Sequence, residues 1–126
     1  MSLKNVYILC EASVFHVLQP IWESVELIPD TISFDEQSQD YLIEWIDIVW
    51  DKESVTEFID SALLELQDLE EQEHMGYKKI IVDVERCSAS EESNISGEKY
   101  YDYIFFPYIL VEKPKTFKIM EEKNYE

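Results

Sequence analysis

Glycine, cysteine and long apolar runs are scarce in this sequence, and each scarcity argues against a class of protein. Two glycines in 126 residues argue against the glycine-rich loops that cradle phosphate groups. Two cysteines are too few for a disulfide framework, and no secretory leader is predicted, so free thiols in a reducing cytoplasm are expected. No apolar run reaches the roughly 18 residues of a membrane-spanning helix, so no membrane span is predicted and a cytoplasmic protein is expected.

Motifs for catalysis and for metal binding are also missing from the sequence. The two histidines, His16 and His74, are the only imidazole bases that could activate a nucleophile. Glu71 and His74 have the spacing of half a di-iron site, but the second half is lacking because Ser13 occupies the matching position before His16. Calcium-loop, zinc and nucleotide-binding patterns are absent. The sequence therefore predicts no enzyme, no cofactor and no metal.

What the chain has in excess is negative charge. Its 28 acidic and 10 basic residues give a net charge of −18. Residues 11–77 hold 18 of the acids and one base, Lys52, whereas residues 78–126 hold 10 acids and eight bases. Such a field repels nucleic acid and anionic membranes and accelerates encounters with basic proteins. Solubility alone or a high-salt host would also favour acidity, although a halophile would spread its acids over the whole surface.

Two amphipathic helices are predicted in the acidic part of the chain. Over residues 54–69, apolar side chains recur at the spacing of one buried helix face, and Ser54 and Glu57 have the spacing of a capping box. Over residues 38–50, apolar side chains wrap most of the helix and leave a narrow stripe of carboxylates. The partner-binding residues predicted on the two exposed stripes are Asp40, Glu44, Asp47, Asp51, Glu57, Asp60, Glu65 and Asp68.

Shorter segments flank these helices. Residues 5–10 are predicted to form a buried strand. Residues 13–28 have the apolar spacing of a helix that Pro20 kinks or breaks, although the first half also fits a strand. Residues 29–30 mark a turn, and residues 87–98 are polar and are predicted to be a loop.

The remaining strands are predicted in the C-terminal half. Residues 79–86 alternate between apolar and polar side chains, residues 100–112 are dense in β-forming residues around Pro107, and residues 116–120 form a last short strand. The sequence therefore predicts an α+β fold with a single domain, residues 1–126. In that fold, one antiparallel sheet, largely from the C-terminal half, packs against two or three amphipathic acidic helices.

The charge pattern points to a positively charged partner. Our primary hypothesis is a small non-catalytic binding or inhibitor protein whose carboxylates replace phosphates on a basic, nucleic-acid-handling protein such as a nuclease. Immunity proteins that neutralise nuclease toxins work in this way, as do phage proteins that mimic DNA or inhibit CRISPR effectors (anti-CRISPR proteins). This chain is similar to them in size and acidity, through no specific motif. Direct binding to nucleic acid or membrane is not expected, and the protein is expected to be a monomer or a small homo-oligomer.

Two other hypotheses fit the same sequence. An acidic adaptor subunit of a larger assembly would use exposed aromatic residues as its interface. Its candidate interface residues are Tyr100, Tyr101, Tyr103 and Tyr108. An enzyme acting on a small cationic substrate, such as a polyamine, would use a carboxylate-lined cleft whose acids have raised pKa values.

Overall fold

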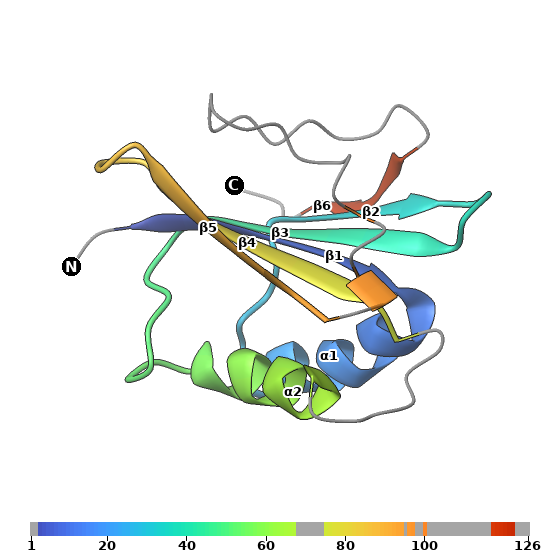
Figure 1. Ribbon diagram of the computed structural model, residues 1–126, viewed down its shortest axis with the longest axis horizontal. Helices are drawn as coiled ribbons and strands as arrows, with labels where there is room; N and C mark the ends of the chain where they lie inside the picture. Colours follow the sequence, from blue (N-terminus) through green and yellow to red (C-terminus); the bar gives the residue numbers. More distant parts are fainter. Residues whose placement is uncertain (1–2, 68–74, 95, 98–99, 101–116, 123–126) are drawn as a thin grey trace.

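The computed structural model describes residues 3–67, 75–94, 96–97, 100 and 117–122 (Figure 1). Their elements, in chain order, are β1 (Lys4–Glu11), α1 (Ala12–Ser24), β2 (Thr31–Asp35), β3 (Asp40–Ile48), α2 (Glu57–Gln67), β4 (Tyr77–Asp83), β5 (Ser88–Ser93) and β6 (Lys118–Glu122). The fold is α+β, as the sequence predicts. Within the described residues, six antiparallel strands form one sheet in the order β5-β4-β1-β3-β2-β6, and two helices accompany it.

The central strands of the sheet come from the N-terminal half of the chain. β1 pairs with β3 on one side and with β4 on the other, so Val6 lies opposite both Trp45 and Ile81. β2 extends the sheet beyond β3 and carries the edge strand β6, whereas β5 is the edge beyond β4. The prediction of a sheet drawn largely from the C-terminal half is therefore wrong, because β1, β2 and β3 all precede residue 49.

β3 is the largest departure from the prediction, which placed a helix over residues 38–50. Asp40–Ile48 is instead a strand that pairs with both β1 and β2. Its residues 42–45 are buried on both faces of the sheet, and a continuous apolar run of this length fits a buried strand as well as a buried helix. The turn before the strand is held by Asp35, whose carboxylate accepts hydrogen bonds from Gln37 N and Ser38 Oγ, both at 3.0 Å.

The helix predicted after the first strand is confirmed by α1, which continues through Pro20 to Ser24. Its buried side chains are Val14, Phe15, Leu18 and Trp22. A proline inside a helix costs about 3 kcal/mol, whereas each large apolar side chain that is fully buried contributes about 1.5–3 kcal/mol. The four buried side chains therefore outweigh the proline, which lies on the exposed side of the helix.

α2 confirms the second predicted helix, although it begins at Glu57 rather than near residue 54. Its buried residues are Ile59, Leu63 and Leu66. The expected capping box is replaced by a local turn in which Ser54 Oγ accepts a hydrogen bond from Thr56 N at 3.2 Å. Neither described helix is long and apolar enough to cross a membrane.

Both helices cover the same face of the sheet, and the main hydrophobic core lies between the two layers (Figure 1). A chain of aromatic rings runs through this core, with centroid distances of 3.9–5.8 Å between neighbours. Its members, in order, are Phe34, Tyr41, Phe15, Trp22, Trp45 and Trp50. Such ring pairs each add about 0.5–1.5 kcal/mol beyond the burial of area, so this chain helps to fix α1 against β2 and β3.

The C-terminal strands match the prediction in part. β4 and β6 correspond to the strands predicted at residues 79–86 and 116–120. The loop predicted at residues 87–98 is wrong over β5, an edge strand that pairs with β4 along its length. β5 is polar and largely exposed, so main-chain pairing rather than apolar burial holds it in the sheet. The strand predicted at residues 100–112 lies outside the described residues, except for Tyr100.

Candidate functional site

The structure separates the four carboxylates that the sequence placed on one helical stripe. Asp40 and Glu44 lie in β3 and are buried, with 4% and 7% of their surface exposed. Asp47 is exposed near the end of β3, and Asp51 is half-buried in the turn that follows. The predicted stripe is therefore wrong, because side chains on a strand alternate between two faces instead of following a helical path.

Asp40 belongs to a buried polar group on the sheet face opposite the helices. The Tyr100 hydroxyl donates a hydrogen bond to Asp40 Oδ1 at 2.8 Å, beside the buried side chains of Leu9 and Leu42. Burial, and then this bond, raise the pKa of Tyr100 above its usual value. Burial, and then the charge of Asp40, likewise raise the pKa of the Cys10 thiol. Asp40 is thus an interior group, and a partner could not reach it in this conformation.

The same contact bears on the adaptor hypothesis. Tyr100, proposed above as an exposed interface residue, is 1% exposed. Tyr101, Tyr103 and Tyr108 lie outside the described residues. The described chain therefore provides no exposed tyrosine from this set for an aromatic interface.

The second predicted stripe is brought together on α2 only in part. Glu65 is exposed and Glu57 is half-buried, whereas Asp68 lies outside the described residues. Asp60 faces inward and accepts hydrogen bonds from Trp50 Nε1 at 2.9 Å and from Lys79 Nζ at 2.6 Å. Asp60 therefore anchors α2 to the sheet and is not available to a partner.

Replacing Asp60 by alanine is expected to lower the free energy of unfolding by about 2 kcal/mol. The substitution removes the acceptor of the Trp50 indole N–H and one partner of Lys79, and the loss of a partner to a buried charged or polar group costs about 1–3 kcal/mol. Glu65→Ala, on the exposed side of the same helix, is the matched control and should stay within about 0.5 kcal/mol. Urea unfolding measures both, and equal costs for the two variants would show that Asp60 is not an anchor.

Most of the described basic residues already have acidic partners around β4. Their N···O distances are Lys4–Asp83 2.6 Å, Lys79–Asp60 2.6 Å, Lys78–Glu91 3.1 Å, Lys79–Glu92 3.5 Å and Arg86–Asp83 3.9 Å. The hydrogen bond from Lys4 lowers the pKa of Asp83 below its usual range, so the carboxylate stays charged at neutral pH. Lys52 and Lys118 form no ion pair with another described residue. Positive charge is therefore neutralised on the β4–β5 side of the molecule.

A groove with an acidic rim lies between the α1–β2 connection and the end of β3. Its volume is about 510 Å³. The residues that line this acidic groove are Glu26, Leu27, Ile28, Asp30, Trp45, Ile46, Asp47 and Ile48. Among them, three are carboxylates and none is basic, while Ile28 and Ile46 are 45% and 40% exposed. The groove therefore presents apolar surface and negative charge together.

The backbone adopts unusual conformations at two residues of this acidic groove. The φ angles of Glu26 and Asp47 are 58° and 54°, in the left-handed region that costs non-glycine residues about 1–2 kcal/mol. A β-bulge near the start of β1 shifts the pairing with β3 at this point, and Asp47 N donates a hydrogen bond to Asn5 Oδ1 at 3.0 Å. Bulges interrupt the regular pairing of strands, and Asp47 lies at this interruption, where it is exposed.

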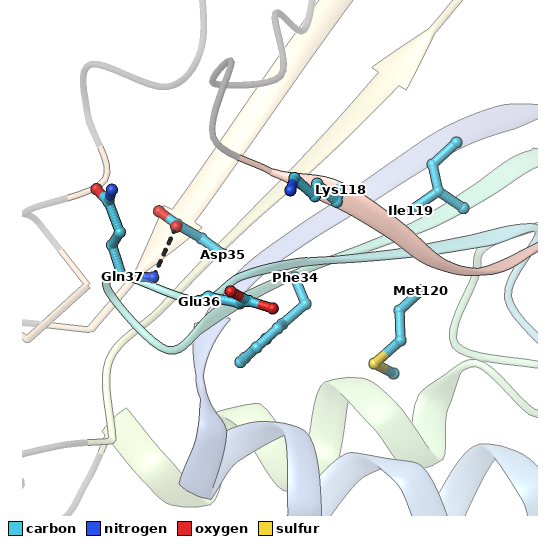
Figure 2. Close-up of a pocket in the computed structure, with 7 residues that line it drawn as sticks. All are labelled: Phe34, Asp35, Glu36, Gln37, Lys118, Ile119 and Met120. Atoms are coloured by element: carbon cyan, nitrogen blue, oxygen red, sulfur yellow. Dashed lines mark hydrogen bonds between the residues drawn. The ribbon is translucent and has the colours of Figure 1, made fainter.

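A second hollow, of about 340 Å³, lies where β2 meets the edge strand β6 (Figure 2). Figure 2 shows Phe34 and Met120 pointing to the same side, whereas Ile119 points to the other side of the strand pair. Glu36 and Lys118 lie at its rim. Because acidic and basic groups share this rim, the hollow suits an apolar side chain and gives no strong preference for a cation.

Groups suited to nucleophilic or metal chemistry do not gather in the part of the chain that the structure describes. No cluster of three or more His, Cys, Asp or Glu side chains there could hold a metal ion. His16 is exposed and makes an edge contact with the Phe15 ring, at a centroid distance of 5.7 Å. Cys10 is buried and Cys87 is exposed in the turn before β5.

Sequence reasoning found one residue of the acidic groove, Asp47, and missed Glu26 and Asp30. The turn predicted at residues 29–30 lies in the wall of the groove. Its contact with β3, in which Ile46 N donates a hydrogen bond to Asp30 Oδ2, joins residues 16 positions apart. A local sequence pattern cannot reveal such a contact. No family model, curated protein or solved structure matches this chain. What the molecule binds must therefore be inferred from its own surface.

Proposed function

We propose that this chain is a small acidic binding protein that docks on a basic surface of another protein. The observation that supports this function best is the separation of charge in the fold. Residues 11–67 comprise the last residue of β1, followed by α1, β2, β3 and α2, and they hold 14 acidic residues and one basic residue, Lys52. Four of the six described basic residues are ion-paired around β4, and among these four only Lys79 pairs with an acid of residues 11–67, Asp60. Within the described residues, little positive charge therefore offsets that half.

The exposed acids of this half supply the docking surface. They are Glu23, Glu26, Glu36, Asp47, Glu53 and Glu65. Their combined field raises the rate of encounter with a cationic partner, and salt screens it over a Debye length of about 8–10 Å. Asp40, Glu44 and Asp60 are excluded from this surface because they are buried or bonded inside the fold.

A nucleic-acid-handling protein is the partner class that fits this surface best. Arginine and lysine side chains that bind phosphates also donate charge-assisted hydrogen bonds to carboxylates, so an acidic protein can occupy a nucleic-acid groove. The proposed activity is therefore stoichiometric inhibition of a basic protein such as a nuclease. Toxin immunity and phage-type inhibition of a nucleic-acid-targeting effector are both forms of this activity.

Reversing Asp47, Glu53 and Glu65 to lysine is expected to weaken partner binding by at least about tenfold, since each exposed charge pair contributes about 0.2–1 kcal/mol and reversal adds repulsion. The partner is first captured from the native host on immobilised protein at low salt, eluted with salt and identified by mass. Its affinity is then measured by calorimetry at several salt concentrations, with and without competing DNA.

The matched control reverses Glu85, Glu121 and Glu122, which are exposed after the end of β4 and on the edge strand β6, and which change the net charge equally. The control should bind almost as well as the unmodified protein, and circular dichroism should be the same for all three. Equal losses for both triple variants would show that net charge alone acts. Binding that neither salt nor DNA weakens would overturn the proposed function.

A further inference from the structure

We propose that the acidic groove is the anchor of this docking surface and takes one arginine or lysine side chain of the partner, flanked by apolar side chains. The inference rests on the proposed function and specifies the chemistry that the partner must present. It combines three properties of the groove: a volume of about 510 Å³, exposed isoleucines, and a rim of three carboxylates.

The apolar part of the groove is rigid where it joins the core. Trp45 is 1% exposed and donates a hydrogen bond from its indole Nε1 to the carbonyl oxygen of Leu27 at 3.1 Å. Ile28 and Ile46 project from this wall and remain 45% and 40% exposed. Exposed apolar side chains beside a fixed wall gain from burial under a partner's apolar side chain.

Two of the three carboxylates that line the groove have no basic partner among the residues that the structure describes. Glu26 and Asp47 form no ion pair with a described basic residue. Asp30 Oδ2 accepts the backbone N–H of Ile46 at 2.7 Å, so Asp30 fixes the rim and adds to its negative field. An incoming guanidinium or ammonium group would meet carboxylates that line one groove, and charge-assisted hydrogen bonds to them would favour binding.

Other surfaces of the described chain fit a cationic anchor less well. The exposed side of α2 carries Phe58 and Leu64, at 58% and 50% exposure, but it is a convex helix surface. The β2–β6 hollow has Lys118 on its rim. Two of the hollows described above contain exposed isoleucines, the acidic groove and the β2–β6 hollow. Of these two, the acidic groove is the one in which every charged lining residue is acidic.

The test uses three blocked tripeptides as probes: acetyl-Leu-Arg-Leu-amide, acetyl-Ser-Arg-Ser-amide and acetyl-Leu-norleucine-Leu-amide. Binding to the full chain is followed by NMR, through the backbone amides of Ile28, Ile46 and Asp47 and the indole N–H of Trp45. The leucine-flanked arginine peptide should shift these resonances saturably and bind about tenfold more tightly than either control peptide. Spermidine, a cation without apolar flanks, should bind no better than the serine-flanked peptide.

Two substitutions at Asp47 separate the carboxylate from the backbone. Asp47→Gly removes the carboxylate and relieves the positive φ, so this variant should resist urea better while it binds the leucine-flanked peptide about fivefold to tenfold more weakly. Asp47→Asn removes the negative charge and should weaken binding similarly. Asparagine tolerates the left-handed region, so the backbone of this variant is not disturbed. Glu53→Gln, outside the groove, should bind the peptide as the unmodified protein does.

Failure of this inference can be told apart from failure of the proposed function. Binding to poly-L-lysine tests the docking surface as a whole. The unmodified protein should bind it in a salt-sensitive way, and the variant with Asp47, Glu53 and Glu65 reversed to lysine should bind it more weakly. If poly-L-lysine binds in that way but the two arginine peptides bind equally, or Asp47→Gly leaves peptide affinity unchanged, the anchor is wrong and the docking surface stands. If spermidine binds best, the groove is a small-cation site. If no cationic probe binds, both proposals fall.

Discussion

Replacing Gly97 by alanine is expected to lower the free energy of unfolding by about 4 kcal/mol, more than the typical 1–3 kcal/mol of an overpacked core. Gly97 does not have a positive φ, so its requirement is steric. A Cβ atom there would overlap the carbonyl group of Tyr77 and lie 2.8 Å from Tyr77 N. The obstacle is the main chain of β4, which is paired on both sides, so a change of side-chain rotamer cannot relieve the overlap.

Asn94 prevents the two segments from moving apart. Its Oδ1 accepts hydrogen bonds from Tyr77 N at 3.1 Å and from Gly97 N at 2.8 Å, and its Nδ2 donates to the carbonyl oxygen of Met75 at 2.7 Å. A shift large enough to admit a methyl group would break these buried bonds, and a buried donor or acceptor left without a partner costs about 1–3 kcal/mol. The alanine therefore has no inexpensive way to fit.

Urea unfolding of Gly97→Ala measures this cost, with Gly76→Ala as the matched control. A Cβ atom at Gly76 would lie 2.6 Å from the carbonyl oxygen of Ser96, a less severe contact, so the control should be destabilised less. Both glycines of the chain thus lie where the main chain at the start of β4 packs closely against the main chain of residues 96–97. A cost below about 1 kcal/mol for Gly97→Ala would mean that the segment around residue 97 yields easily.

Elements with one buried face could be predicted from the sequence. In α1 and α2 the apolar residues follow a helical period, because only one side of each helix meets the sheet. The alternation of apolar and polar residues also identified β4 as a strand, although both of its faces are largely buried. Lys78 and Lys79 are buried there through ion pairs with residues distant in sequence. Pairing of this kind leaves no periodic pattern.

β3 and β5 could not be predicted for opposite reasons. β3 is covered on both faces, so its apolar run has no period, and Asp40 and Glu44 are acids on one covered face whose spacing also matches a helical turn. β5 has almost no apolar side chains, and its place in the sheet follows from main-chain pairing with β4. In both strands the deciding contacts are long-range, and a local pattern does not contain them.

The candidate site could be predicted in its charge but not in its geometry. The excess of acid between residues 11 and 67 is evident in the sequence, and in the fold most of those residues belong to α1, β2, β3 and α2. Which acids reach solvent depended on the identity of β3: Asp47 lies in the acidic groove, whereas Asp40 is bonded to Tyr100. Composition is thus enough to predict that the surface is acidic. Predicting which acids form a docking surface also requires the pairing of the strands, which decides the acids that are exposed.

Alkaline solution is expected to destabilise the fold steeply, by about 4 kcal/mol per pH unit above roughly pH 10. Burial, with further contributions from nearby carboxylates such as Glu92 and Asp40, raises the pKa values of Tyr77 and Tyr100, and burial raises the pKa of Cys10. Below the ordinary pKa values of these groups the folded and unfolded states are equally protonated, so no stability is lost. Above them the unfolded chain releases the three protons that these groups retain in the folded chain, and each contributes about 1.4 kcal/mol per pH unit. Burial also raises the pKa of Tyr7, which acts in the same direction.

Urea unfolding at a series of pH values, followed by circular dichroism, measures this slope, and tyrosinate absorbance reports the ionisation. Tyr100→Phe is the decisive variant. At neutral pH it should lose stability, because Asp40 loses the hydrogen bond that Tyr100 donates. Above pH 10 its slope should be shallower by about 1.4 kcal/mol per pH unit, since one titrating group is gone. Lysines and exposed tyrosines titrate alike in both proteins, so an unchanged slope would show that Tyr100 is not held neutral by the interior beside Asp40.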